Sequence, residues 1–87
     1  MKKQINFRNS ALVDYAYWAL NDKRIFKKIN SLIEDIQRNG YSGIGKPEAL
    51  KGNFSGWHSR RIDDENRLIY IIEEESIIIH SCKGHYE

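Results

Sequence analysis

The sequence contains one cysteine, one proline and no long apolar run in its 87 residues. The lone Cys82 excludes an internal disulfide and fits a reducing cytoplasm, which is where we expect the protein to act. A membrane-spanning helix needs roughly 20 consecutive apolar residues, and no stretch approaches that length, so we expect no membrane association. The first residues, MKKQINFRN, include lysines but are not followed by an apolar region, which argues against a secretory signal.

The sequence patterns of several common sites are also missing. His58, His80 and His85 lack metal-ligand spacing, and one cysteine cannot complete a structural zinc site, so we expect no metal and no cofactor. Segment 43–47 contains glycines but does not match a phosphate-binding loop, and no serine-nucleophile motif is present. The formal net charge of +2 is too small to indicate nucleic-acid binding by itself, so the distribution of charge matters more than its total.

The remaining composition is that of a globular protein. Hydrophobic residues make up 40% and charged residues 30% of the chain, a balance that argues against disorder. The length is near the lower end of what one hydrophobic core can stabilise without disulfides or metals. We therefore expect a single domain over residues 1–87.

Hydrophobic periodicity predicts one strand and two helices in the first half of the chain. Residues 3–8 alternate as a half-buried strand does, and Asn9-Ser10 can cap the helix that follows over 11–20. One face of this helix carries the apolar residues Leu12, Tyr15, Ala16 and Ala19. Asn21-Asp22 ends it and caps a second helix, which runs to Asn39-Gly40. The second helix has a clear apolar stripe made of Ile25, Ile29, Leu32, Ile33 and Ile36. Its opposite face, with several lysines, Glu34 and Asp35, is expected to be solvated.

The second half predicts three strands in succession. They span 57–62, 67–73 and 76–82, and the first two are separated by the polar turn 63–66. The last two strands are apolar almost throughout, which indicates burial on both faces, so at least one of them should lie centrally in a sheet. The amino-terminal strand joins this antiparallel meander, and both helices pack on one face. The fold class is therefore α+β with two layers.

Charged groups cluster around the meander and the glycine-rich loop 40–56. Arg60, Arg61 and Arg67 flank one turn and cannot all be buried, because an unpaired buried guanidinium is costly. Metal-free attack on a phosphodiester needs a general base, a general acid and fixed cations. Glu48 and His85 could supply the proton transfers, and Arg67, Arg61 and Lys51 the cations. The residues alone leave open the alternative that these are ordinary surface groups.

The sequence resembles a known protein family over nearly its whole length. The residues that carry the resemblance are Asp14-Tyr15, Tyr17-Trp18, Asp22-Lys23-Arg24, Lys27-Lys28-Ile29-Asn30, the segment 43–51 from Gly43 to Lys51, Ser59-Arg60-Arg61-Ile62, Asn66-Arg67-Leu68-Ile69-Tyr70 and Cys82-Lys83-Gly84-His85-Tyr86. In this order and spacing they resemble YoeB/Txe-type toxins of the RelE superfamily. The resemblance implies a RelE-like fold and an endoribonuclease that cleaves mRNA in the ribosomal A site, leaving a 2′,3′-cyclic phosphate and a 5′-hydroxyl.

The resemblance also implies roles for individual residues. Glu48 matches the family's general base, His85 its general acid, and Arg67 its phosphate-stabilising arginine. Tyr86 matches a carboxy-terminal tyrosine that helps to form the site. Lys51 and Arg61 match further basic positions near the scissile phosphate.

The implied partners are a cognate antitoxin, the ribosome with its mRNA, and operator DNA only through the antitoxin complex. A homodimer is left open, and Tyr15, Tyr17 and Trp18 are expected to serve helix packing or a dimer contact. His58 and His80 are expected to be ordinary strand residues. The chain departs from the family in having His58 after Trp57, where an aromatic residue is common, and in extending to Glu87. The alternative function is a catalytically silent binding module within an autoregulatory DNA-binding complex.

Overall fold

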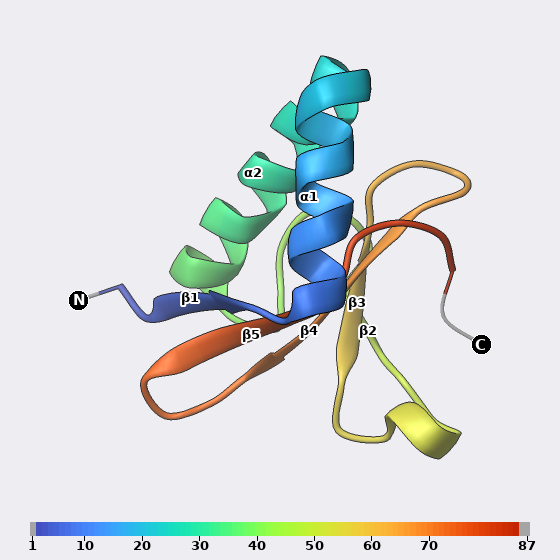
Figure 1. Cartoon of the computed structure of the whole chain (residues 1–87). Coiled ribbons are helices and arrows are strands. Elements are labelled where there is room, and N and C mark those ends of the chain that lie inside the picture. The colour runs from blue at the N-terminus through green and yellow to red at the C-terminus, as the bar shows by residue number, and fades with distance from the viewer. Residues whose placement is uncertain (1, 86–87) are drawn as a thin grey trace.

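The computed structural model describes residues 2–85 of the chain. A strand and two α-helices are followed by a loop with a short strand and a 3-10 helix, and then by three strands (Figure 1). The elements are β1 (Gln4–Phe7), α1 (Asn9–Asn21), α2 (Lys23–Asn39), β2 (Glu48–Ala49), η1 (Gly52–Phe54), β3 (His58–Arg61), β4 (Arg67–Ile72) and β5 (Ser76–Ser81). The predicted order is confirmed, and β2 is an additional strand inside the glycine-rich loop.

The strands form one mixed five-stranded sheet in the order β1-β5-β4-β3-β2. β3, β4 and β5 make the predicted antiparallel meander. β1 pairs in parallel with β5, and β2 pairs antiparallel with β3 at the other edge. The apolar strands β4 and β5 are therefore both interior strands, which confirms the prediction that at least one of them is central.

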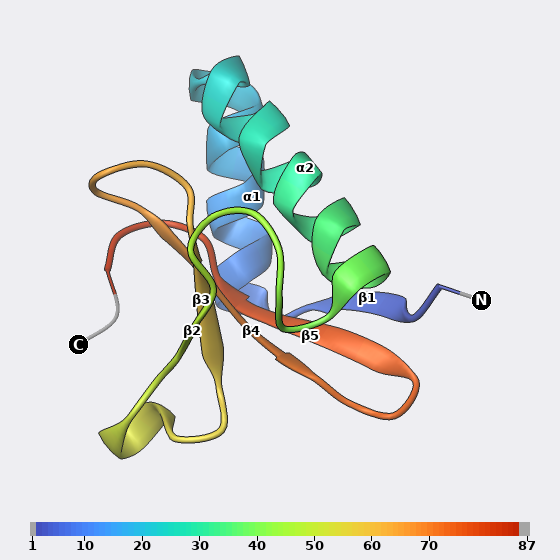
Figure 2. The same cartoon turned by 180° about the vertical axis from the view of Figure 1, so that it is seen from behind.

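Both helices lie on the same face of the sheet, and among residues 2–85 no α-helix covers the opposite face (Figures 1 and 2). The predicted stripe of α2 forms much of the core, with Ile29 and Leu32 completely buried. Each fully buried aliphatic side chain of this kind stabilises the fold by about 1.5–3 kcal/mol. Neither of the two helices is long and apolar enough to cross a membrane.

The prediction for the buried face of α1 was wrong. Except for the half-buried Tyr15, the predicted face is exposed, and Leu12 retains 55% of its accessible surface. Ala11 and Trp18 are the buried residues of this helix. Because apolar residues surround much of α1, its helical period does not single out one face. Packing against the sheet makes that choice.

The helix ends follow local signals with one exception. Asp22 caps α2 as predicted, because its Oδ1 accepts hydrogen bonds from two backbone N–H groups of the first turn at 3.1 and 3.2 Å. At α1, however, Asn9-Ser10 lies inside the helix, and the capping residue is Arg8, whose side chain makes no capping bond. Ser10 Oγ instead donates to the backbone oxygen of His80 at 2.7 Å. A contact with the sheet thus replaces the predicted local cap.

Candidate active site

Glu48 lies on the short edge strand β2, where its side chain is exposed. It pairs with Ser59 of β3, and the Leu50 N–H extends this pairing by donating to the backbone oxygen of Trp57 at 2.9 Å. Leu50 is only 6% exposed, so apolar packing as well as hydrogen bonding holds the edge strand. The predicted base is therefore presented to solvent from a fixed backbone.

Arg61 and Arg67 lie directly opposite each other on β3 and β4. Arg60 is fully buried against α2, so strand alternation places its neighbours Ser59 and Arg61 on the face of the sheet that the helices leave uncovered. On this face Ser59 is only 4% exposed and Arg61 is half-buried. Cross-strand partners share a face, which puts Arg67 beside Arg61 and Glu48 beside Ser59. One carboxylate and two guanidinium groups thus share the face that the helices leave uncovered.

Two guanidinium groups directly opposite each other repel. Within residues 2–85, neither Arg61 nor Arg67 forms an ion pair with a carboxylate. Arg67 Nη1 donates instead to the backbone oxygens of Asp63 at 2.8 Å and Asn66 at 3.1 Å. These bonds fix the guanidinium, and the nearby Asp63 carboxylate interacts with its charge without forming a direct ion pair in the described part of the chain. Two fixed cations without direct ion-pair partners suit the binding of an anion such as a phosphate.

The main chain brings the residue before His85 to the first residue of β4. The Arg67 N–H donates to the backbone oxygen of Gly84 at 2.9 Å, which places Gly84 beside the start of β4. His85 is the next residue along the chain. His85 is exposed. Lys51 is also exposed and precedes η1, but no contact with Arg61 or Arg67 ties it to the cation pair in the described part of the chain. Tyr86 lies outside the described residues.

The carboxy-terminal segment is anchored where it leaves β5 by residues of α1. The Cys82 N–H donates to Asp14 Oδ2, and its backbone oxygen accepts from Trp18 Nε1, both at 2.9 Å. The next residue, Lys83, places its ammonium 4.8 Å from the centre of the Tyr17 ring. Burial, with a smaller effect of the Asp14 charge, raises the pKa of the Cys82 thiol to about 12. The buried thiol is therefore protonated and unreactive at neutral pH.

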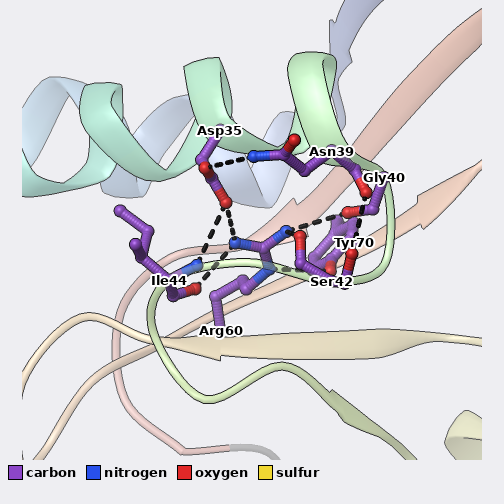
Figure 3. A network of polar contacts seen from close by, with 7 residues as sticks. All are labelled: Asp35, Asn39, Gly40, Ser42, Ile44, Arg60 and Tyr70. Carbon is purple, nitrogen blue, oxygen red and sulfur yellow. Dashed lines mark hydrogen bonds and ion pairs between the residues drawn. The ribbon is translucent and has the colours of Figure 1, made fainter.

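A buried charge network that the sequence did not predict is centred on Arg60 (Figure 3). The Arg60 side chain is completely buried, and its guanidinium donates five hydrogen bonds. The acceptors are Asp35 Oδ2 at 2.7 Å, Tyr70 Oη at 3.0 Å, and the backbone oxygens of Gly40, Ser42 and Ile44 at 2.8, 3.0 and 2.7 Å. The hydrogen bond from Arg60 holds the pKa of Asp35 below its usual value. Asp35 had been predicted to be a solvated surface residue, and that prediction was wrong.

This network fixes the chain that leads to Glu48. Three of its acceptors are carbonyls of segment 40–44, which comes just before β2. One feature of the sequence could have indicated that an arginine is buried. Arg60 and Arg61 are adjacent in a strand, so they must point to opposite faces, and one of them must point toward the helices.

Two glycines of this loop serve close packing around the network. A Cβ atom on Gly43 would lie 1.9 Å from Asp35 Oδ2, and one on Gly45 would lie 2.8 Å from Leu32 Cδ2. Both residues also have positive φ angles, of 134° and 82°, which favour glycine. The glycines that failed to match a phosphate loop are therefore required by the fold.

The two strand histidines are partly buried and lie against aromatic rings. His58 stacks on Tyr41 with ring centres 3.7 Å apart, and burial lowers its pKa. His80 lies 5.3 Å from the ring of Phe54 and 5.5 Å from that of Trp57. Burial, aided by the positive charge of Arg8, also lowers the pKa of His80. The structure places neither histidine in contact with Glu48, Arg61 or Arg67.

These lowered pKa values predict that the protein loses stability in mild acid. Well above the ordinary histidine pKa of about 6.5, both histidines are neutral in the folded and unfolded states. Below that pH the unfolded chain binds protons that the folded protein resists, so the free energy of unfolding should fall from pH 7 toward pH 5. Urea unfolding at several pH values measures this slope. His58→Phe retains a stacking ring but removes one titrating group, so it should reduce the slope. An unchanged slope in this variant would contradict the assignment to His58.

The candidate site is an open surface rather than an enclosed pocket. A hollow of about 420 Å³ lies elsewhere, between the start of α2 and the β3–β4 turn. It is lined by Asp22, Arg24, Ile25, Lys28, Ile62 and Asp63. None of the predicted site residues that the structure describes lines it. Within residues 2–85, no group of three or more His, Cys, Asp or Glu side chains is arranged to hold a metal ion. The exposed carboxylate and imidazole, with the half-buried guanidiniums of Arg61 and Arg67, suit proton transfer and phosphate binding on a large substrate.

Comparison with solved structures identifies the class of protein that has this fold. A YoeB dimer from Staphylococcus aureus matches with a TM-score of 0.93 and 49% identity, over 99% of this chain and 100% of that chain. A heterotetrameric YoeB–YefM toxin–antitoxin complex from the same organism matches with a TM-score of 0.90 and 49% identity, again over 99% and 100% of the two chains. The fold is thus one that occurs in bacterial toxins of toxin–antitoxin systems.

Sequence comparison then identifies the family. The family described as YoeB-like toxin of bacterial type II toxin–antitoxin system matches residues 7–86. Toxin YoeB of Escherichia coli strain K12 is 53% identical over 73 residues, which are 84% of this chain and 87% of that protein. The chain therefore belongs to the family of YoeB-like toxins of bacterial type II toxin–antitoxin systems. This confirms the family resemblance that the sequence motifs indicated.

Proposed function

We propose that the protein is a ribosome-dependent endoribonuclease that cleaves mRNA in the ribosomal A site and so stops translation. The observation that supports this most directly is the strand register, which places Glu48 on the same open face as Arg61 and Arg67. The hydrogen bond between Arg67 and Gly84 brings the segment that carries His85 to this face. A base, an acid and fixed cations are the groups that cleavage of a phosphodiester requires.

The proposed reaction uses the RNA's own 2′-hydroxyl as nucleophile. Glu48 removes the proton of that hydroxyl, and its oxygen attacks the adjacent phosphorus. The bond from phosphorus to the 5′-oxygen breaks, and His85 protonates the leaving oxygen, giving a 2′,3′-cyclic phosphate and a 5′-hydroxyl. Arg67 and Arg61, with Lys51, stabilise the negative charge that builds up on the phosphate.

Tyr86, whose position the structure does not describe, is proposed to complete the site. An open site of this kind depends on its substrate being held in place, and the ribosome supplies an mRNA fixed in one position. The protein is proposed to act in the cytoplasm, where translating ribosomes are found.

The proposed regulator is a cognate antitoxin. Relatives from Staphylococcus aureus have been solved as a YoeB dimer and as a YoeB–YefM complex. By analogy, we propose that this protein forms a complex with an antitoxin and can also form a homodimer. Acidic side chains of the antitoxin would complement the open cationic face around Arg61 and Arg67. Contact with operator DNA would come only through the antitoxin complex.

A substrate lacking one oxygen tests the proposed chemistry. Programmed ribosomes are given either all-RNA message or a message with a single 2′-deoxyribose immediately before the cut. The all-RNA message should be cleaved, with the fragment ends mapped by primer extension. The deoxy-substituted message should resist cleavage, because the nucleophile is absent.

Two further results of this experiment distinguish the proposed mechanism from the alternatives. Brief chelation that leaves ribosomes intact should not slow the chemical step, because no proton transfer here is assigned to a metal. Cleavage of the deoxy-substituted message at the same position would disprove attack by the 2′-hydroxyl. Absence of cleavage on both messages would instead support a catalytically silent binding module.

A further inference from the structure

The segment that leads to His85 is held by the turn between β3 and β4. The N–H of Gly84 donates to Asn66 Oδ1 at 2.8 Å, and the backbone oxygen of Gly84 accepts from the Arg67 N–H at 2.9 Å. Figures 1 and 2 both show the carboxy-terminal segment passing beside this turn. Gly84 has a φ of 81° and no side chain to restrain it, so these two bonds define its position. His85 is attached directly to this residue.

The Asn66 side chain is fixed in the orientation that this contact needs. It is 8% exposed, and its Nδ2 donates to both carboxylate oxygens of Asp63 at 3.0 and 3.3 Å. A carboxylate only accepts hydrogen bonds, so it must face the amide NH₂ group. The amide oxygen is then directed to the Gly84 N–H. Burial alone would raise the pKa of Asp63, but hydrogen bonds from the backbone N–H of Glu65 and from Asn66 outweigh it and lower the pKa, which keeps the carboxylate charged.

The same turn also holds the catalytic arginine. Arg67 Nη1 donates to the backbone oxygens of Asp63 and Asn66, as described above. One rigid turn therefore fixes both the phosphate-binding cation and the backbone that carries the acid. In the described part of the chain, the His85 side chain has no hydrogen-bond partner of its own. Its position relative to Arg67 therefore depends on Gly84.

We propose that Asn66 is a positioning residue for the proposed nuclease, acting through Gly84 to hold the His85 imidazole at the leaving oxygen. The inference rests on the proposed function. Misplacement of a catalytic group by about 1 Å can lower a rate by about 100-fold. Asn66→Ala removes the acceptor of the Gly84 N–H. It should lower the single-turnover cleavage rate by about 10- to 100-fold, and the ribosome concentration that gives half the maximal rate should stay the same.

A double-variant cycle with His85 separates positioning from a general structural role. If Asn66 acts through His85, Asn66→Ala should slow cleavage by less than about 2-fold when His85→Ala is already present, because coupled residues are not additive. An equal loss in both backgrounds would overturn the proposal. Asn6→Ala on the edge strand β1 is a matched control, because it makes the same chemical change at an exposed site. It should leave the cleavage rate unchanged.

Amide hydrogen exchange tests the contact without any enzyme assay. In the isolated wild-type protein the Gly84 amide should be protected, and Asn66→Ala should speed its exchange by about 10-fold or more with little change in β4. Asn66→Asp is nearly isosteric but sets a second carboxylate against Asp63, to which it cannot donate, so it should also lose protection at Gly84, even if the alanine variant folds poorly. Unprotected Gly84 in wild type, or protection at Gly84 unchanged in both variants, would overturn the proposed contact. A protected Gly84 in a protein that cleaves no mRNA would instead disprove the proposed function alone.

Discussion

A chain that ends at Gly84 should cleave ribosome-bound mRNA about 100-fold more slowly than the full chain, or more slowly still, yet remain folded. The truncation removes His85, the proposed general acid, and loss of such a group lowers rates by about 10²- to 10⁴-fold. His85 is exposed and contributes little to the core, so the free energy of unfolding should change by less than about 1 kcal/mol. Thermal unfolding and single-turnover cleavage, measured on the same preparations, test both parts.

Two controls locate the effect within the removed residues. Deleting Glu87 alone should leave most activity intact, because no catalytic step is assigned to it. His85→Gln keeps a polar side chain of similar size but cannot donate a proton as an imidazolium does, so it should lose nearly as much activity as the truncation. If the chain ending at Gly84 cuts mRNA at close to the wild-type rate, the assignment of His85 is wrong.

Asp35→Ala should lower the free energy of unfolding by about 3–5 kcal/mol, because it leaves a buried guanidinium without its counter-charge. The ion pair between Arg60 Nη1 and Asp35 Oδ2 is 2.7 Å long, and the arginine side chain in it is 0% exposed. A small domain has a total stability of only about 5–15 kcal/mol, so this single change removes a large part of it. Denaturant unfolding of wild type and variant measures the difference.

The adjacent residue of α2 provides a matched control for this loss. Glu34 also pairs with an arginine, Arg38, but at 3.8 Å and with both side chains more than 60% exposed. Glu34→Ala should change the free energy of unfolding by less than about 0.5 kcal/mol, because such exposed pairs contribute little. If both variants are equally stable, the Arg60–Asp35 pair is not the stabilising contact described above.

Local sequence patterns predicted the elements because each pattern repeats within a few residues. The stripe of α2 has five apolar residues at helical spacing, and its cap, Asp22, lies directly before it. The apolar runs of β4 and β5 predicted at least one interior strand for the same reason. Family motifs added the assignment of Glu48, Arg67 and His85, which no local periodicity contains. The structure places Glu48 and Arg67 on one face and leads the chain to His85, while their catalytic roles stay a proposal.

Contacts between distant residues were decided only by the tertiary structure. Asp35 and Arg60 are 25 positions apart, and nothing next to either residue specifies the other. Neither the parallel pairing of β1 with β5 nor the buried face of α1 follows from the segments themselves, because several arrangements bury similar apolar area. In the sequence, Asn66 belongs to an ordinary polar turn. Its contact with Gly84 is visible only in the tertiary structure, where the end of the last strand lies beside that turn. The sequence by itself determined the helices, the strands and the chemical groups available for a site. The tertiary structure decided which of those groups are buried, which are paired and which are left exposed on one face, because these properties depend on partners that folding brings together.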